Sequence, residues 1–323
     1  MIYPWQQNSW NSLSQGRRNN HMPHALLIAG AEYCGKVDFA KSLAKSLLCE
    51  NRDEANQVAC NQCKSCRLFV AGSHPDYTAV HLIEKKSQIV VDQIRGLNEF
   101  IYLSRSYEGS RVVIISPVER LNINAANSLL KTLEEPPEKT VLILVSSSPS
   151  ELIPTIRSRC QLLHLPQPSY AEGLQWLTTQ TLENPADELL VAAAGKPMLA
   201  KQLDEGERLA SRKQLATDIL KLLRGNLSLV NVAKQWEKAP KADLLDWQLQ
   251  WVQEMIKSKY QLERKSTDTI SPHLYRLMIQ SVNNLWELRD GLLELKSHAH
   301  TSLSPLLFTE DMLLLWQKQS LSQ

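Results

Sequence analysis

The chain has 323 residues, of which 43% are hydrophobic and 22% are charged, with only 11 glycines and 15 prolines. This length predicts two or three folding units, and the composition excludes collagen-like, low-complexity and largely disordered chains. The 36 basic and 34 acidic residues leave a formal charge of +2. Because that charge is small, we do not expect the chain alone to bind nucleic acid strongly.

Neither a membrane segment nor a secretory signal is expected. No stretch approaches the roughly 18 uncharged apolar residues that a spanning helix needs. The first residues, Met1 to Gln6, form neither a basic stretch nor an apolar run of the kind that a signal peptide carries. We therefore expect a cytoplasmic protein without membrane contact, whose six cysteines stay reduced.

The first 165 residues alternate between short apolar runs and helical patterns. Residues 25–29 predict a buried strand, residues 30–35 a turn and residues 36–48 a helix. Two further continuous runs, 112–115 and 141–145, predict strands buried on both faces, as in a parallel sheet. Between them a helical pattern over 122–135 stops at two prolines. This order predicts a doubly wound, parallel α/β domain.

After Pro166 and Pro168 no convincing strand follows. Shorter helical patterns extend to about residue 205, and long amphipathic ones follow, with breaks at Gly225, Pro240, Ser271-Pro272 and Ser304-Pro305. We predict three domains: an α/β domain at 1–165, a small helical lid at 166–206 and an all-α domain at 207–323. For the tryptophans of the last part, the plainest interpretation is burial in its core: Trp236, Trp247, Trp251, Trp286 and Trp316.

The segment from Gly30 to Val37 nearly fits the phosphate-loop motif G-x-x-x-x-G-K-[ST] between a strand and a helix. Gly30, Gly35 and Lys36 supply the glycines and the lysine that such a loop uses to bind phosphates. Val37 lacks the hydroxyl that would hold Mg²⁺, and Glu32 adds a negative charge to an anion loop. We interpret the loop as a degenerate nucleotide site, the plain alternative being an ordinary strand–helix turn.

The carboxylates that an active phosphate-loop ATPase needs after a neighbouring strand are also missing. Ser116 and Pro117 stand where an acidic pair would be expected, and Glu119 comes too late to replace it. We therefore expect no ATP hydrolysis by this chain. The competing hypothesis is an active ATPase motor with an atypical Mg²⁺ site.

Four cysteines lie close together in sequence: Cys49, Cys60, Cys63 and Cys66. Four thiolates suit a closed, tetrahedral, structural zinc site, so we predict a zinc module at residues 49–66. A redox pair or unrelated buried thiols are the alternatives, and His74 could replace Cys49 as a ligand. A zinc-dependent DNA-binding module is a weaker functional hypothesis, because the net charge is near zero.

The sequence LLKTLEEPP at residues 129–137 closely resembles a motif of the bacterial clamp-loader ATPases, an AAA+-like family. The order of features along the chain agrees with that family: a loop that nearly matches the phosphate-loop motif, a cysteine-rich insertion, this helix and then Ser158-Arg159-Cys160. Residues 3–5 (YPW) and 73–77 (SHPDY) add to the likeness. Within the family, the delta-prime subunits of DNA polymerase III lack parts of both ATPase motifs, and this chain resembles them over residues 1–165.

The resemblance implies a set of roles. Arg159, between Ser158 and Cys160, would be an arginine finger that reaches the ATP of a neighbouring subunit. Arg157, two residues earlier, is the arginine that could be mistaken for it. The four cysteines would bind zinc, and the C-terminal helices would form a collar. The partners implied are the motor (gamma/tau) and delta subunits in a hetero-pentameric ring, which acts on the sliding clamp and primer-template DNA. The chain would then be a non-hydrolysing subunit of a DNA-directed DNA polymerase complex.

Overall fold

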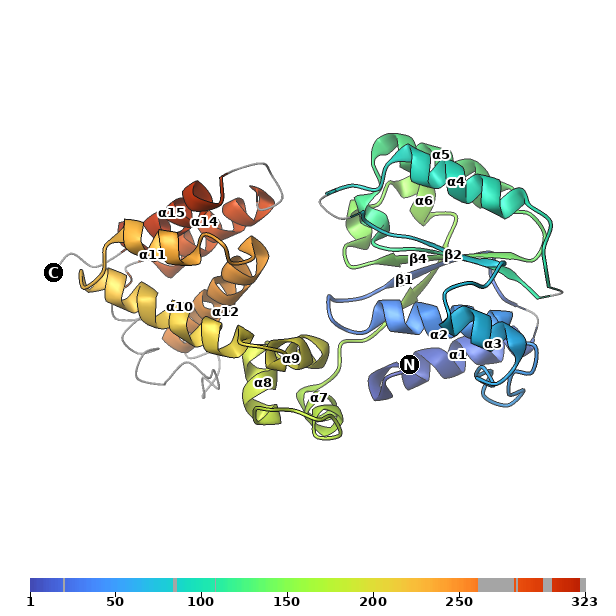
Figure 1. The fold of residues 1–323 in the computed structure, drawn as a ribbon, viewed down its shortest axis with the longest axis horizontal. Coiled ribbons are helices and arrows are strands. Elements are labelled where there is room, and N and C mark those ends of the chain that lie inside the picture. The colour runs from blue at the N-terminus through green and yellow to red at the C-terminus, as the bar shows by residue number, and fades with distance from the viewer. Residues whose placement is uncertain are drawn as a thin grey trace. The chain divides into compact units, whose positions relative to one another are not determined.

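The chain divides into two compact units, Met1–Glu172 and Gly173–Gln323, which Figure 1 shows as ribbons. The computed structural model describes residues 1–19, 21–83, 86–107, 109–260, 282, 284–298 and 304–319. The predicted helix break at Ser271-Pro272 lies outside these residues. The further division predicted at residues 206/207 stays a prediction.

The first unit contains a five-stranded sheet in the order β2-β3-β4-β1-β5, and every neighbouring pair is parallel. The strands are β1 (Ala25–Ala29), β2 (Tyr77–Val80), β3 (Arg111–Ile115), β4 (Thr140–Ser146) and β5 (Gln161–His164). All residues of the three inner strands β1, β3 and β4 are buried. These are the three continuous apolar runs of the sequence, so their prediction is confirmed.

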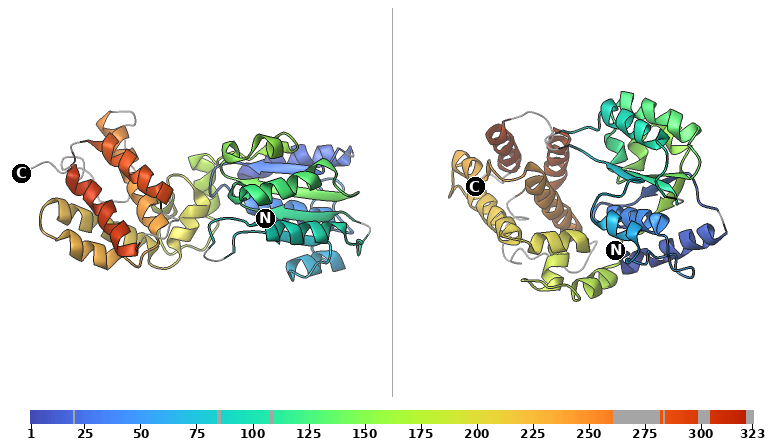
Figure 2. Two further views of the ribbon diagram at one scale, coloured as in Figure 1. Left: turned by 90° about the horizontal axis from the view of Figure 1, so that it is seen from above. Right: turned by 45° about the vertical axis from the view of Figure 1, so that its right-hand side comes forward.

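Helices cover both faces of this sheet (Figures 1 and 2). One face packs against α1 (Gln7–Arg18) and α2 (Lys36–Leu48), and the other packs against α4 (Val91–Tyr102) and α5 (Ile123–Glu134). Alternate strand residues serve the two cores, with Leu26 and Ile28 on the first face and Leu27 on the second. The predicted α/β fold, a parallel sheet between two layers of helices, is confirmed.

Short elements complete the first unit. They are η1 (Pro4–Gln6), α3 (Lys64–Val70), η2 (Val118–Arg120), η3 (Pro149–Glu151) and α6 (Pro154–Arg157). Helix α5 begins where the Asn122 side chain accepts a hydrogen bond from the Ala125 amide at 2.8 Å, and it ends before Pro136, as the sequence predicts.

A buried ion pair joins two segments of the first unit that are distant in sequence. Asp76 Oδ1 lies 3.2 Å from Arg111 Nη2, and each side chain is 2% exposed. The Arg111 guanidinium also donates to the carbonyls of Phe100 and Ile101 at the end of α4. The Asp76 carboxylate accepts from the amides of Ser106 and Tyr107. This network fixes the chain between α4 and β3, and the sequence analysis did not foresee it.

The described part of the second unit is all helical: α7 (Tyr170–Leu177, which begins in the first unit), α8 (Ala186–Ala192), α9 (Pro197–Asp204), α10 (Arg208–Leu223), α11 (Leu229–Trp236), α12 (Lys241–Lys259), α14 (Leu285–His298) and α15 (Pro305–Lys318). Its core buries four of the five tryptophans for which burial was predicted, namely Trp236, Trp247, Trp251 and Trp316, whereas Trp286 is 45% exposed. The prediction of core tryptophans is therefore confirmed at four positions and wrong at Trp286. None of the helices in the described ranges is long and apolar enough to cross a membrane.

Candidate functional sites

The glycine loop follows β1 and leads into α2. Gly35 adopts φ 83° at the N-cap of α2, a conformation that favours glycine. Lys36 is 7% exposed, and its Nζ donates a hydrogen bond to the Ala31 carbonyl of the same loop at 2.7 Å. The amine that would bind the outer phosphates of a nucleotide is thus bonded to the loop itself.

The N-terminal segment covers this loop. Trp5 Nε1 donates to the Cys34 carbonyl at 3.0 Å, and Gln6 Nε2 donates to the carbonyls of Cys34 and Gly35 at 2.8 and 3.0 Å. The Tyr3 ring stacks on Trp5 with 4.9 Å between centroids. A methyl group added at Gly35 would come within 2.5 Å of the Tyr3 ring. The sequence contains YPW at residues 3–5 but gives no signal of this contact.

Tyr3 fixes the cover to α2 as well. Its hydroxyl donates to Asp38 Oδ2 at 2.8 Å. Burial, and then the bond to Asp38, raise the pKa of the Tyr3 phenol well above its usual value. The phenol therefore stays protonated and keeps its role as a donor.

The residues around the missing acidic pair are engaged in local structure. Glu119 Oε1 accepts a hydrogen bond from the Ser147 amide, just after β4, at 2.9 Å. Val37 is 39% exposed, and its side chain has no oxygen that could bind a cation. As the sequence indicates, neither Val37 nor Ser116-Pro117 provides the ligands of a usual Mg²⁺ site.

The four clustered cysteines converge, and all their Sγ atoms lie within 4.8 Å of one another. The Sγ atoms of Cys49 and Cys63, and those of Cys60 and Cys66, are 4.0 Å apart. Tetrahedral Zn²⁺ with bonds near 2.3 Å requires sulfurs about 3.8 Å apart. The donor set therefore fits a metal such as zinc, held by four protein ligands with no position left for substrate.

Backbone amides support this cluster. The amides of Cys60, Cys63 and Cys66 each donate to the sulfur of another cysteine at 3.3 Å. Hydrogen bonds from the Gln62 and Cys63 amides lower the pKa of the Cys60 thiol to about 6. Burial raises the pKa of the Cys49 and Cys66 thiols, so binding of a metal there would be coupled to the release of their protons.

His74 is not a member of the cluster, contrary to the alternative in which it replaces Cys49. Its Nδ1 accepts from the Asp76 amide at 3.1 Å, so Nε2 carries the hydrogen and faces Ser65 Oγ at 2.8 Å. Ser65 in turn donates to the Leu48 carbonyl, next to Cys49, at 2.6 Å. His74 thus links the cysteine module to the start of β2 as an outer support.

Arg159 lies between α6 and β5. Its guanidinium pairs with Glu134 Oε1 at 2.6 Å and donates to the Thr155 carbonyl at 3.0 Å, with 34% of the side chain exposed. Ser158 Oγ donates to the same carbonyl at 3.2 Å. Cys160 packs against the apolar core, and burial raises the pKa of its thiol to about 11. Of the three residues, Arg159 alone offers a charged group near the surface.

The parallel sheet with its glycine loop between β1 and α2 defines an α/β protein of the phosphate-loop type. The family model for "DNA polymerase III, delta subunit" matches residues 5–169. The DNA polymerase III subunit delta' of Pseudomonas aeruginosa is 39% identical over 264 residues, which cover 81% of this chain and 78% of that protein. The chain belongs to the family of DNA polymerase III delta' subunits, as its motifs predicted.

Further proteins are similar to this chain. The delta' subunit of Haemophilus influenzae is 32% identical over 81% of this chain and 79% of its own length. The delta' subunit of Escherichia coli is 33% identical over 66% of this chain and 64% of its own length. A solved gamma subunit-related protein of Thermotoga maritima aligns over 95% of this chain and 99% of its own, with 17% identity and a TM-score of 0.45.

Proposed function

We propose that this chain is a non-hydrolysing, stator-like subunit of a clamp loader, which helps to load the sliding clamp onto primed DNA. In this function Arg159 acts in trans, on the ATP of a neighbouring motor subunit. The partners would be the gamma/tau and delta subunits of a hetero-pentameric ring in the cytoplasm, and the second unit would supply the collar and lid.

The observation that carries this proposal is the position of Arg159 on the sheet. Strand β5 pairs in parallel with β1, from Leu26 opposite Gln161 to Ala29 opposite His164. Arg159 precedes β5, whereas Gly30 follows β1, so the two lie toward opposite edges of the sheet. The four paired residues alone separate them by roughly 13 Å along the strands. The arginine is therefore poorly placed for the chain's own loop and suited to a site on another subunit.

The chemistry of an arginine fits this role. A guanidinium is permanently charged and presents a planar fork of donors that matches phosphoryl oxygens. In the free chain Glu134 balances that charge. The pair is partly exposed, which makes it weak and exchangeable, so a γ-phosphoryl group could replace the carboxylate at little cost.

The glycine loop supports the other half of the proposal. Three hydrogen bonds from Trp5 Nε1 and Gln6 Nε2 tie the Cys34 and Gly35 carbonyls to the N-terminal segment, and Val37 cannot supply the hydroxyl for Mg²⁺. Zinc held by the four cysteines would be structural, because four thiolates complete its coordination. Its role would be to fold residues 49–66 onto α2 and β2.

The decisive experiment is reconstitution of the loader with Arg159→Ala, using Arg157→Ala as the matched control. An arginine finger in trans contributes roughly 10³–10⁵-fold to hydrolysis at its site. We expect single-turnover hydrolysis at the adjoining site to be lost with Arg159→Ala and kept with Arg157→Ala. Unchanged turnover in the presence of DNA and clamp would overturn the finger assignment.

A second measurement addresses the active-motor alternative. The isolated chain is mixed with Mg·ATP at millimolar concentration, and binding and phosphate release are followed. We expect neither. Turnover that Lys36→Ala abolishes would instead establish the chain as a motor with an atypical Mg²⁺ site.

A further inference from the structure

A pocket of about 330 Å³ lies at the amino ends of β1 and β4. The residues that line it include Arg17, His24, Arg52, Ser110, Lys139 and Thr140. The glycine loop follows the carboxyl end of β1, so this pocket lies at the opposite edge of the sheet. Arg159 is not among its lining residues, and the functions discussed above leave the pocket unused.

The charge of this pocket is one-sided. Two arginines and a lysine line it, and no carboxylate is among its described lining residues. The acidic residue next to Arg52 in sequence, Asp53, is turned toward its own loop, where it accepts from the amides of Ala55 and Asn56. A cluster of cations without counter-charges is costly, which indicates an anionic ligand.

The Arg17 guanidinium has a buried hydrogen-bond donor for which the described residues provide no acceptor. Its side chain comes from the last turn of α1, the residue is 9% exposed, and Nη1 donates to Ser46 Oγ at 3.0 Å. Nη2 is buried and has no hydrogen-bond partner within the described residues. Burial and then the positive charge of Arg52 lower the pKa of Arg17 to about 10. A buried donor without an acceptor is unusual in a folded protein.

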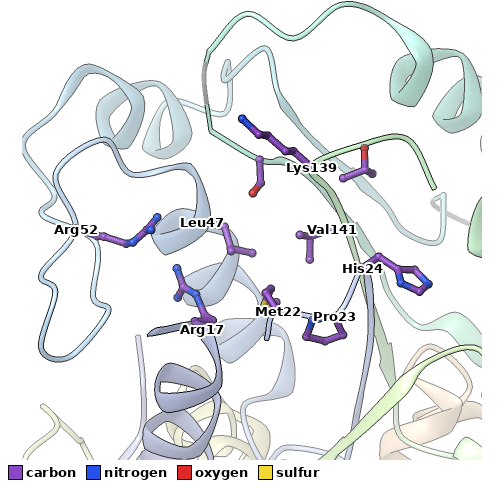
Figure 3. A pocket seen from close by; sticks show the side chains of 10 residues that line it. Arg17, Met22, Pro23, His24, Leu47, Arg52, Lys139 and Val141 are labelled. Atoms are coloured by element: carbon purple, nitrogen blue, oxygen red, sulfur yellow. The ribbon is translucent and has the colours of Figure 1, made fainter. Parts of the chain in front are cut away.

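The exposed cations complete the arrangement. Figure 3 shows the guanidinium groups of Arg17 and Arg52 approaching each other, with Lys139 across the pocket mouth. Lys139 adopts φ 56°, which is uncommon for a residue other than glycine, and its carbonyl accepts from the Arg111 amide at 2.8 Å. His24 is engaged elsewhere, with Nε2 at 3.2 Å from the Leu133 carbonyl.

From this geometry we propose that the pocket binds a phosphate group of a phosphorylated ligand, with Arg52 and Lys139 as direct contacts and Arg17 as the buried charge beneath them. Guanidinium forks match phosphate oxygens in shape and charge. The Ser110 and Thr140 hydroxyls add possible donors at the pocket wall. The phosphate could belong to a free small molecule or to a nucleic-acid backbone, and the proposal is independent of the role of Arg159.

The test uses the full-length, metal-loaded chain and inorganic pyrophosphate, with binding followed by calorimetry at low salt. The variant Arg52→Ser/Lys139→Ser removes the two contacts. Its matched control, Lys41→Ser/Lys86→Ser, removes the same charge from two exposed sites outside the pocket. We expect at least about tenfold weaker binding with the first variant and little change with the control. Both are surface changes, and circular dichroism verifies folding.

Competition then identifies the source of the phosphate. If a short single-stranded oligonucleotide displaces pyrophosphate, the ligand is a nucleic-acid backbone, and a steep salt dependence should accompany it. If it does not, the ligand is a small phosphorylated molecule. Absence of pyrophosphate binding up to about 10 mM, or equal weakening by both double variants, would overturn the proposal.

Discussion

The buried pair between Asp76 and Arg111 makes a strong prediction about stability. The first unit contains a second Asp–Arg pair, Asp92 with Arg95, whose oxygen–nitrogen distance of 3.1 Å is almost the same as the 3.2 Å of the buried pair. The two pairs differ in burial. The side chains of Asp76 and Arg111 are each 2% exposed, whereas those of Arg95 and Asp92 are 67% and 81% exposed. Replacing each aspartate by asparagine therefore compares the loss of a buried pair with the loss of an exposed one.

The expected magnitudes differ severalfold. Asp76→Asn leaves the Arg111 charge buried without its counter-ion, which costs about 3–5 kcal/mol. It also weakens the acceptor for the Ser106 and Tyr107 amides. Asp92→Asn removes an exposed pair that contributes about 0–1 kcal/mol. Since a domain is stable by only about 5–15 kcal/mol, the first change should remove a large part of the stability of the first unit.

Hydrogen exchange with mass spectrometry on the full chain can localise this loss. Peptides spanning residues 91–115 should exchange much faster in Asp76→Asn, whereas peptides from α10 in the second unit serve as an internal reference. Urea denaturation should show the midpoint of the first unit lowered by about 1–5 M, which is the expected loss divided by slopes of about 1–3 kcal/mol per M. Equal effects of Asp76→Asn and Asp92→Asn would refute the argument that burial determines the cost.

Three further predictions concern the sites. Cys66→Ser should lose the bound metal by elemental analysis, and Cys34→Ser should keep it; full metal content in Cys66→Ser would argue against the four-thiol site. Because burial lowers the pKa of His74 in the folded chain, the unfolded chain becomes protonated at a higher pH than the folded chain does. The free energy of unfolding should therefore decrease as the pH is lowered through about 6.5. Thermal melts of His74→Gln should lack this part of the pH dependence, and identical pH profiles would contradict it. Glu134→Gln should change loader ATPase only a few-fold, since its ion pair is half exposed, and Glu135→Gln should not change it; a large loss would show that the carboxylate is itself required.

Much of the central fold is readable from the sequence because its signals are local. The inner strands are continuous apolar runs, and the stop at Pro136 follows from proline stereochemistry. The edge strands β2 and β5 give no such signal. They have four residues each, and three of the four residues of β5 are exposed, so an apolar pattern cannot mark them.

The candidate sites divide in the same way. Cysteine spacing within one short segment predicts a cluster that the structure brings together. The cover of the glycine loop joins residues 28–29 positions apart, and the Asp76–Arg111 pair spans 35 positions. The cationic pocket combines Arg17, Arg52 and Lys139 from three segments. No local pattern encodes such pairings, because parallel topology determines which ends of the strands meet.

The covered glycine loop also bears on the proposed function, in which this chain hydrolyses no nucleotide. Ordering a residue costs roughly 1–2 kcal/mol of conformational entropy, and in a motor subunit a bound nucleotide can offset that cost. Here the hydrogen bonds from Trp5 and Gln6 hold Cys34 and Gly35 in place, and Lys36 bonds to Ala31. The loop follows β1 directly, and β1 pairs with β5, which begins just after Arg159. An internally fixed loop thus stabilises the strand pair that positions the arginine, so its placement would not depend on ATP bound to this chain.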